Sequence, residues 1–301
     1  METIINVIEP VSPESERLLA VWKALAPPIR PSPNEIESYA RCSAGGAGTR
    51  VLVQGITSEL VDLAIRQRTS RVIGMDWRVA MFPAMRCLGK EDWSQVEAIV
   101  CDWRTFLPQL EGALDLVLGD GSLTMIAFPE DWERVLQILQ RYLVLGGRAV
   151  LRLAFQLEEN FDFGSYLGKT LARFDRECAK ATPVQRAGFL RGLIAEIRLA
   201  IGLGSAGQTG AVDLGRRADL IRLSCAELTA RYSHWTEWET VQFALPSEED
   251  ARKGVRTGKA VPRWGAALQL IEACGFRVRH VEWTGKRTAP GAMRLFAAER
   301  V

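Results

Sequence analysis

The sequence predicts an α/β fold in which helices cover both faces of a mostly parallel sheet. Between residues 50 and 154, short and wholly apolar runs alternate with helical patterns, which is typical of strands buried on both faces. Two later apolar runs, 276–283 and 294–298, predict closing strands, so we expect residues 275–299 to form an antiparallel pair at one edge of the sheet. With 301 residues, of which 48% are apolar, the chain is long enough to bury such a core.

Each predicted element has a local signal. Strands are predicted at the apolar runs 51–53, 72–75, 98–101, 114–118 and 148–153. Helices are predicted from apolar periodicity at about 58–68, 79–88, 129–143 and 262–274. Gly146-Gly147 is expected to stop the helix that begins near Pro129. Ser12-Pro13 and Ser32-Pro33 predict two N-terminal helices, because serine caps a helix and proline suits its first turn.

The middle of the chain interrupts this alternation. It contains only helical patterns, at about 166–179, from 183 and from 214, and a glycine-rich stretch at 202–215 that we expect to be a hinge or lid. The sequence therefore predicts three parts: N-terminal helices (1–49), a sheet domain (50–154 and 262–301) and a helical insertion (155–261).

Composition excludes several classes of protein. A net charge of +2, with 25% charged residues, gives no global reason to expect a nucleic acid or an anionic membrane as partner. No apolar run reaches 18 residues, and the acidic start does not resemble a secretory signal. The six cysteines form no CxxC pair and only two histidines occur, so no structural metal site is expected. We expect a soluble, cytoplasmic protein with free thiols.

The residues that follow the predicted strands favour a nucleoside-bearing cofactor, since ligands bind at the carboxyl ends of strands in open α/β sheets. Gly55 allows close approach of a ligand, and Asp76, 21 residues later, suits a ribose diol. Asp102, after the third strand, can accept from an exocyclic adenine amine. The side chains that can cover the ring are Trp77, Met81 and Trp103.

Two other nucleotide motifs are absent. A dinucleotide-binding GxGxxG would need glycine where Thr57 and Leu60 stand, so a nicotinamide cofactor is disfavoured. Gly168-Lys169-Thr170 lacks the upstream glycine and the preceding strand of a phosphate-binding P-loop.

Six segments together carry a resemblance to a known family. They are VLVQGITSEL (51–60), VIGMDW (72–77), IVCDW (99–103), LDLVLGDGS (114–122), LVLGGRAVLRL (143–153) and GFRVRHVEWTG…MRLFAAER (275–300). In order and spacing the chain resembles the class I S-adenosylmethionine-dependent methyltransferases over about 50–153 and 263–301. The first motif reads Gly-x-[ST]-x-Glu after its strand, a departure from the glycine-rich GxGxG loop.

The resemblance implies a fold, a cofactor and its contacts. It implies a Rossmann-like, seven-stranded, mostly parallel sheet with an antiparallel closing strand. It implies S-adenosylmethionine as cofactor, S-adenosylhomocysteine as product, and Gly55, Asp76, Asp102 and Asp120 as cofactor contacts. Asp120 stays open between a cofactor contact, a helix cap and a substrate contact. Asp76 and Asp102 can instead cap the helices that follow them, and the two tryptophans can instead pack against loops. Thr57 can cap the following helix and still contact the cofactor.

The function we expect is in-line transfer of a methyl group to a small-molecule acceptor. One alternative keeps the cofactor but cyclises or cleaves it without methylation. Another is a non-catalytic regulatory protein that retains the fold. A nucleic-acid acceptor is disfavoured, because the chain has neither an NPPY-like motif nor a basic aromatic motif. The acceptor, its reacting atom and the oligomeric state stay open.

The substrate side is expected to come from the insertion, as a cap over the methyl-donor end. The stretch Tyr232–Trp238 supplies His234 and Glu237 as candidate catalytic bases, or else its aromatics only fill a seam against the sheet. Arg152 either meets a substrate carboxylate or pairs with an internal acid. The basic loop 251–259 is expected to be a solvated connector. His280 is expected to be a structural residue.

Overall fold

The computed structural model describes residues 3–5, 12–25, 27, 29–44, 48–157, 161–205, 213–240, 242, 261–284 and 292–301. Its strands are β1 (Thr3–Ile5), β2 (Arg50–Gln54), β3 (Arg71–Asp76), β4 (Val96–Val100), β5 (Leu114–Asp120), β6 (Leu143–Ala154), β7 (Phe276–Trp283) and β8 (Met293–Arg300). Its α-helices are α1 (Pro13–Ala24), α2 (Pro33–Cys42), α3 (Ser58–Arg66), α4 (Met81–Arg86), α5 (Glu130–Tyr142), α6 (Phe163–Cys178), α7 (Pro183–Gly204), α8 (Leu214–Tyr232) and α10 (Trp264–Ala273). Short 3₁₀ turns are η1 (Pro108–Leu110), η2 (Leu123–Met125) and η3 (Thr236–Thr240).

All eight described strands form one sheet, in the order β1-β4-β3-β2-β5-β6-β8-β7. Strands β2 to β6 are mutually parallel, and β8 runs antiparallel to both β6 and β7. The predicted antiparallel pair at one edge is therefore confirmed, with β7 outermost. The seven strands expected from the sequence are present as β2 to β8, and β1 adds an eighth by pairing antiparallel with β4 at the opposite edge. A run of only three residues gave the sequence too little periodicity to predict that strand.

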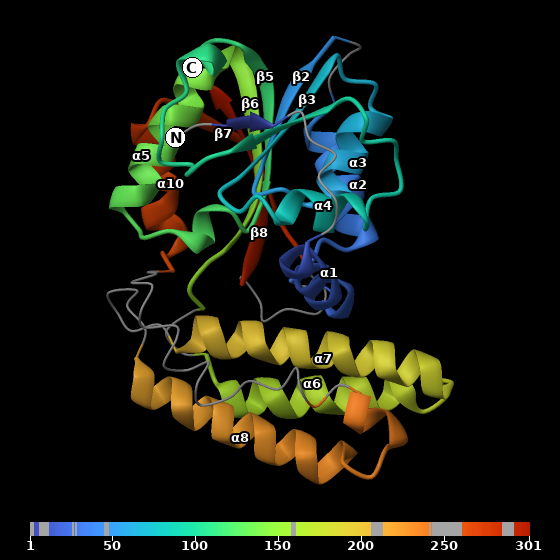
Figure 1. Cartoon of the computed structure of the whole chain (residues 1–301). Coiled ribbons are helices and arrows are strands. Elements are labelled where there is room, and N and C mark those ends of the chain that lie inside the picture. Colours follow the sequence, from blue (N-terminus) through green and yellow to red (C-terminus); the bar gives the residue numbers. More distant parts are fainter. Residues whose placement is uncertain are drawn as a thin grey trace.

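Helices cover the two faces of the sheet, as predicted (Figure 1). On one face, α2, α3 and α4 pack against a core that includes Val51, Val53 and Leu118. On the other face, α5 and α10 pack against a core that includes Leu52, Val117 and Phe296. Neighbouring residues of β2 thus point into opposite cores, which explains why this strand is apolar throughout.

Local signals located most helix boundaries. Ser12 and Ser32 cap α1 and α2, each followed by proline in the first turn. In α2 the cap is a reciprocal capping box, since the Glu35 carboxylate accepts from the Ser32 backbone N–H at 2.6 Å. The expected helix stop at Gly146-Gly147 was wrong. The helix α5 ends at Tyr142, and the two glycines lie inside β6, where Gly146 takes a φ of 75° and the pairing with β5 is irregular.

We expect Ser32→Ala to lower the free energy of unfolding by about 1 kcal/mol, because it removes the hydroxyl that accepts from the Glu35 backbone N–H. Urea denaturation measures the change. The control is Ser165→Ala, an exposed serine in the first turn of α6, which should stay within about 0.5 kcal/mol of the parent. Equal losses in the two variants would contradict the capping role.

Beyond β6, the helices α6, α7 and α8 stack on one another below the sheet, with α7 nearest to it (Figure 1). They share an apolar core that includes Leu171, Ile194 and Leu228. A smaller cluster joins Leu203 of α7 to Met293 at the start of β8, so the stack contacts the sheet directly. No helix within the described ranges combines the length and the apolar character needed to cross a bilayer.

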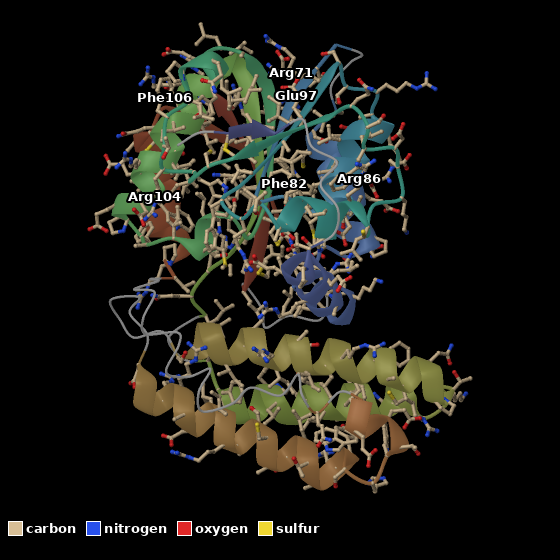
Figure 2. The ribbon with its side chains drawn as sticks, viewed as in Figure 1. Arg71, Phe82, Arg86, Glu97, Arg104 and Phe106 are labelled. Carbon is tan, nitrogen blue, oxygen red and sulfur yellow. The ribbon has the colours of Figure 1, made fainter. Side chains whose placement is uncertain are left out.

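The opposite end of the sheet carries an ordinary structural ion pair. Arg71 and Glu97 lie at the start of β3 and β4 and are joined by two hydrogen bonds of 2.7 Å. Figure 2 shows both side chains at the end of the sheet away from α6, α7 and α8. Both are more than one-third exposed, so this pair contributes little to stability and serves below as a control.

Candidate functional site

A cavity of about 350 Å³ lies at the carboxyl ends of β2, β3 and β5. The order of the strands reverses there, because β2 lies between β3, which leads on to β4, and β5, which leads on to β6. Its walls also include residues of α1, of the turn after β4, of β6, α7 and β8. Seven of the eight residues predicted to bind a cofactor line it: Gly55, Thr57, Asp76, Trp77, Met81, Trp103 and Asp120.

Gly55 begins the turn after β2 with a φ of 69°, a conformation that favours glycine. A Cβ atom at this position would lie 3.2 Å from the Trp103 ring. The chain therefore needs glycine here both for the turn and for close approach of its neighbours. The Thr57 hydroxyl donates to the Gly55 carbonyl at 3.1 Å, so it does not cap α3 through its side chain.

The Asp76 carboxylate ends β3 inside the cavity and is only 5% exposed. Its Oδ1 accepts from the Arg78 backbone N–H at 2.9 Å. Burial raises the pKa of Asp76 to about 6, although backbone hydrogen bonds from Arg78 and Ile56 oppose the shift. A carboxylate that is costly to bury and faces a cavity is suited to accept hydrogen bonds from a ligand.

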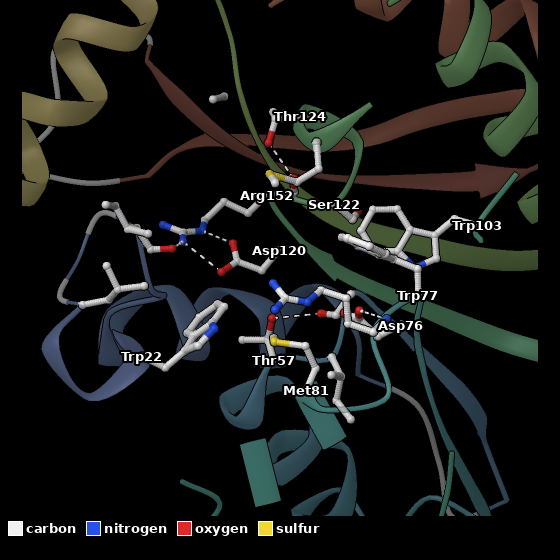
Figure 3. A pocket seen from close by; sticks show the side chains of 18 of the residues that line it. Trp22, Thr57, Asp76, Trp77, Met81, Trp103, Asp120, Ser122, Thr124 and Arg152 are labelled. Carbon is white, nitrogen blue, oxygen red and sulfur yellow. Dashed lines mark hydrogen bonds and ion pairs between the residues drawn. The ribbon is translucent and has the colours of Figure 1, made fainter. Parts of the chain in front are cut away.

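Two tryptophans flank this end of the cavity, as Figure 3 shows. The Trp77 side chain is 63% exposed, whereas Trp103 is 8% exposed. The buried Trp103 Nε1 has no hydrogen-bond partner among the described residues. An exposed indole beside a cavity is a feature that a bound aromatic ring would explain.

The other end of the cavity contains a buried triad, which we define as Glu35, Asp120 and Arg152. Arg152 Nε and Nη2 donate to the two Asp120 oxygens at 2.6 and 3.0 Å, and Nη1 donates to Glu35 at 2.8 Å. The three side chains are between 0% and 5% exposed. Burial raises the pKa of Asp120 even though Arg152 opposes the shift. Arg152 thus pairs with internal acids, which was one of the two interpretations left open by the sequence.

Asp102 is the predicted cofactor residue that the structure leaves outside the cavity. Its carboxylate is about half exposed and pairs with Arg104, which in turn reaches Asp131. Hydrogen bonds from Arg104 lower the pKa of Asp102. A contact with adenine would require this carboxylate to turn away from its present partner.

The structure does not bring His234 and Glu237 to the cavity. Their neighbours Tyr232 and Trp238 pack into the core of the α6–α8 stack, and His234 is exposed. The aromatics of this stretch therefore fill neither a pocket wall nor a seam against the sheet, which corrects both interpretations of the stretch 232–238. His280 is exposed on the edge strand β7, 3.5 Å from Glu282.

Several predicted features lie outside the described residues: most of the glycine-rich stretch (206–212), the basic loop 251–259 and the hairpin 285–291. The structure adds lining residues that the sequence did not single out. Among them are Trp22, Leu25 and Ile29 from the N-terminal segment, Leu199 of α7, and Met293. The sequence singled out Asp120 and Arg152 but not Glu35, the third member of the triad.

The cavity fits a nucleoside-bearing cofactor on three observations: the glycine turn, the buried Asp76 carboxylate and the exposed Trp77 indole. A metal centre is not indicated, because the described ranges contain no group of three or more His, Cys, Asp or Glu side chains placed to hold an ion.

Comparison with known proteins shows similarity in fold to solved structures but no match in sequence to a family or a curated protein. No family model and no curated protein matches the sequence. A candidate Zn-dependent alcohol dehydrogenase from Rhodobacter sphaeroides is similar in structure at 15% identity and a TM-score of 0.54, covering 97% of this chain and 100% of that chain. An S-adenosylmethionine-dependent methyltransferase from Mesorhizobium loti is similar at 17% identity and a TM-score of 0.46, covering 87% and 96%. A SAM-dependent methyltransferase from Methanosarcina mazei is similar at 13% identity and a TM-score of 0.47, covering 90% and 99%.

The sheet itself defines the class of fold. Its parallel core, its reversal point beside β2 and the antiparallel β8 inserted before β7 define a Rossmann-like α/β fold with a mixed sheet. The fold expected from the sequence motifs is therefore confirmed. What the site does chemically is a separate inference from its side chains.

Proposed function

We propose that this chain is an S-adenosylmethionine-dependent methyltransferase that acts on a small-molecule acceptor. The observation that carries the proposal is the arrangement of one cavity. A buried carboxylate, Asp76, lies beside two tryptophans, Trp77 and Trp103, at one end, and a second carboxylate, Asp120, lies toward the other end (Figure 3). The first end suits a nucleoside, and the second end is where an acceptor would meet the methyl donor.

Each residue at the nucleoside end has a role in the proposal. Asp76 accepts hydrogen bonds from the two ribose hydroxyls, while Trp77, Met81 and Trp103 contact the faces and edge of the adenine. Gly55 lets the ligand approach the turn after β2, and Thr57 supports that turn through its bond to the Gly55 carbonyl. Asp102 remains a predicted contact for the adenine amine.

When bound, S-adenosylmethionine would supply a methyl group attached to a positively charged sulfur. The acceptor attacks the methyl carbon in line, and the sulfur is the leaving group. The protein's task is alignment and exclusion of water, since charge disperses during this displacement. Leu199 of α7 and Met293 of β8 close the cavity on the side of the α6–α8 stack, which supports the role of the insertion as a substrate cap. Neither His234 nor Glu237 takes part in the reaction proposed here.

Calorimetric titration with S-adenosylhomocysteine tests the cofactor site through Gly55→Ala. The added Cβ imposes strain at a positive φ and meets the Trp103 ring at 3.2 Å, at the turn that the ligand must approach. We expect a loss of at least about tenfold in affinity, equivalent to about 1.4 kcal/mol.

The matched control is Gly112→Ala. Gly112 also has a positive φ, of 61°, but a Cβ there meets nothing within 4 Å. Both variants should lose about 1 kcal/mol of stability to backbone strain, and only Gly55→Ala should lose affinity. No binding to the parent protein would favour a non-catalytic role. Methylthioadenosine instead of S-adenosylhomocysteine as the product would favour cofactor cleavage over methylation.

A further inference from the structure

The chemistry of the acceptor can be inferred from the buried triad of Glu35, Asp120 and Arg152. This inference rests on the function proposed above. Asp120 and Arg152 line the cavity, and Glu35 holds Arg152 from behind. Figure 3 shows that Asp120 and Arg152 lie between Trp22 on one side and Asp76, Trp77 and Trp103 on the other. The triad therefore lies away from the nucleoside end.

Arg152 has little capacity left for a ligand. Its Nε and Nη2 are bound to Asp120, its Nη1 to Glu35, and Nη2 also reaches the Ile29 carbonyl at 3.5 Å. The guanidinium is completely buried. It therefore cannot serve as the anchor for a substrate carboxylate without breaking a buried ion pair.

Asp120 is in the opposite situation. Each of its oxygens accepts one N–H from Arg152, and among the described residues the carboxylate has no other hydrogen-bond partner. A carboxylate offers about four acceptor positions, so Asp120 retains capacity toward the cavity that it lines. Two carboxylates against one guanidinium also leave an excess of one negative charge in a buried place.

The neighbouring charges do not remove this excess. Arg30 is paired with Glu59, and Arg78, the other arginine that lines the cavity, is paired with Glu14. Asp76 adds a further carboxylate at the nucleoside end. Because an uncompensated buried charge is costly, this end of the cavity favours a ligand group that carries a positive charge.

We propose that the acceptor is an amine with an apolar body, and that Asp120 binds its ammonium form and accepts the proton it loses. A carboxylate acceptor is already anionic when it docks, and a hydroxyl acceptor becomes anionic when it loses its proton for the attack, so the excess carboxylate disfavours both. An amine is cationic when it docks and neutral when it attacks. Trp22, Ile29, Leu199 and Met293 supply the apolar walls.

The reaction balances with the residues present. The nitrogen lone pair forms the new C–N bond while the C–S bond breaks and leaves its electron pair on sulfur. The proton that the nitrogen must lose passes to the Asp120 carboxylate and from there to water, one proton for each methyl group transferred. Glu35 acts as a positioning residue, because it reaches the site only through Arg152.

Sinefungin tests the charge at this end of the cavity. In this analogue a carbon bearing an ammonium group replaces the sulfur, so a cation stands where the methyl group would be transferred. We expect calorimetry to show that sinefungin binds at least about tenfold more tightly than S-adenosylhomocysteine. Asp120→Asn should bring the ratio to about one. Glu35→Gln should also lower this affinity ratio. If Asp120→Asn does not fold, the Glu35→Gln variant provides the test of the charge. Glu97→Gln, in the ion pair at the far end of the sheet, should leave the ratio unchanged.

A second measurement uses the acceptor side directly. Saturation-transfer NMR on the protein loaded with S-adenosylhomocysteine should detect 2-phenylethylamine in preference to the isosteric 2-phenylethanol. Sinefungin that binds no better than S-adenosylhomocysteine, or an amine that binds no better than the alcohol, overturns the amine proposal and leaves the methyltransferase proposal standing. Failure of S-adenosylhomocysteine itself to bind would overturn both.

Discussion

Replacing Arg152 with methionine is expected to lower the free energy of unfolding by about 3–5 kcal/mol. The substitution keeps an unbranched side chain of similar length but removes the only guanidinium in the buried triad. Glu35 and Asp120, which are 5% and 4% exposed, would then face each other without a counter-charge. Removing one partner of a buried ion pair is costly because the remaining charge is left desolvated and unpaired.

The control for this prediction is Arg71→Met. Arg71 also bridges to a carboxylate through two hydrogen bonds, but both partners are more than one-third exposed. We expect its loss to cost at most about 1 kcal/mol. Adding Glu35→Gln and Asp120→Asn to Arg152→Met should recover much of the stability, since neutral groups no longer require the guanidinium. Similar unfolding midpoints for the two single variants in urea would contradict the buried triad.

Much of the nucleoside end could be predicted from the sequence because its signals are local. Gly55 and Asp76 each follow directly on an apolar run, and parallel strands bring their carboxyl ends to one edge of the sheet. The strand period and the position after the strand thus define where these side chains lie. Asp102 followed the same rule, yet Arg104, two residues later, holds its carboxylate outside the cavity. The position of a residue after a strand predicts where its backbone lies, but it does not predict which neighbouring group its side chain will bind.

At the acceptor end the sequence singled out Asp120 and Arg152, but it could not predict the partners of Arg152, since these contacts join distant parts of the chain. Glu35 and Arg152 are 117 residues apart, and no sequence pattern linked them. The prediction that the aromatic stretch 232–238 lies at the cavity or against the sheet was wrong for a related reason. Apolar and aromatic residues fill any core equally well, so their pattern cannot say whether they pack against the sheet or inside the α6–α8 stack.

The Asp76→Asn substitution is expected to change stability and affinity in opposite directions. Burial raises the pKa of Asp76 to about 6 in the folded protein, above its usual range in an unfolded chain. A carboxyl group with a raised pKa stabilises the fold fully only at pH values below its unfolded pKa. That contribution is lost as the pH rises through about 6. At pH 8 the neutral asparagine should therefore raise the free energy of unfolding by about 1–3 kcal/mol.

The same substitution should weaken S-adenosylhomocysteine binding by about 1.5–3 kcal/mol, roughly 10- to 100-fold, because a charged acceptor for the ribose hydroxyls is lost. A stabilising change that damages binding is the signature of a residue kept for function. If Asp76 only shaped the turn through its bond to the Arg78 N–H, asparagine could replace it in that bond and the affinity would not change.

The pH dependence of binding gives an independent readout of the same carboxylate. Only the ionised form of Asp76 accepts from both ribose hydroxyls, so the affinity of the parent protein should be constant above pH 7. It should then fall as the pH drops through about 6, by up to about tenfold per unit. The Asp76→Asn variant should show a flat profile over the same range. Calorimetric titrations between pH 5 and 8 measure both, and an equal pH dependence in the two proteins would assign the titration to another group.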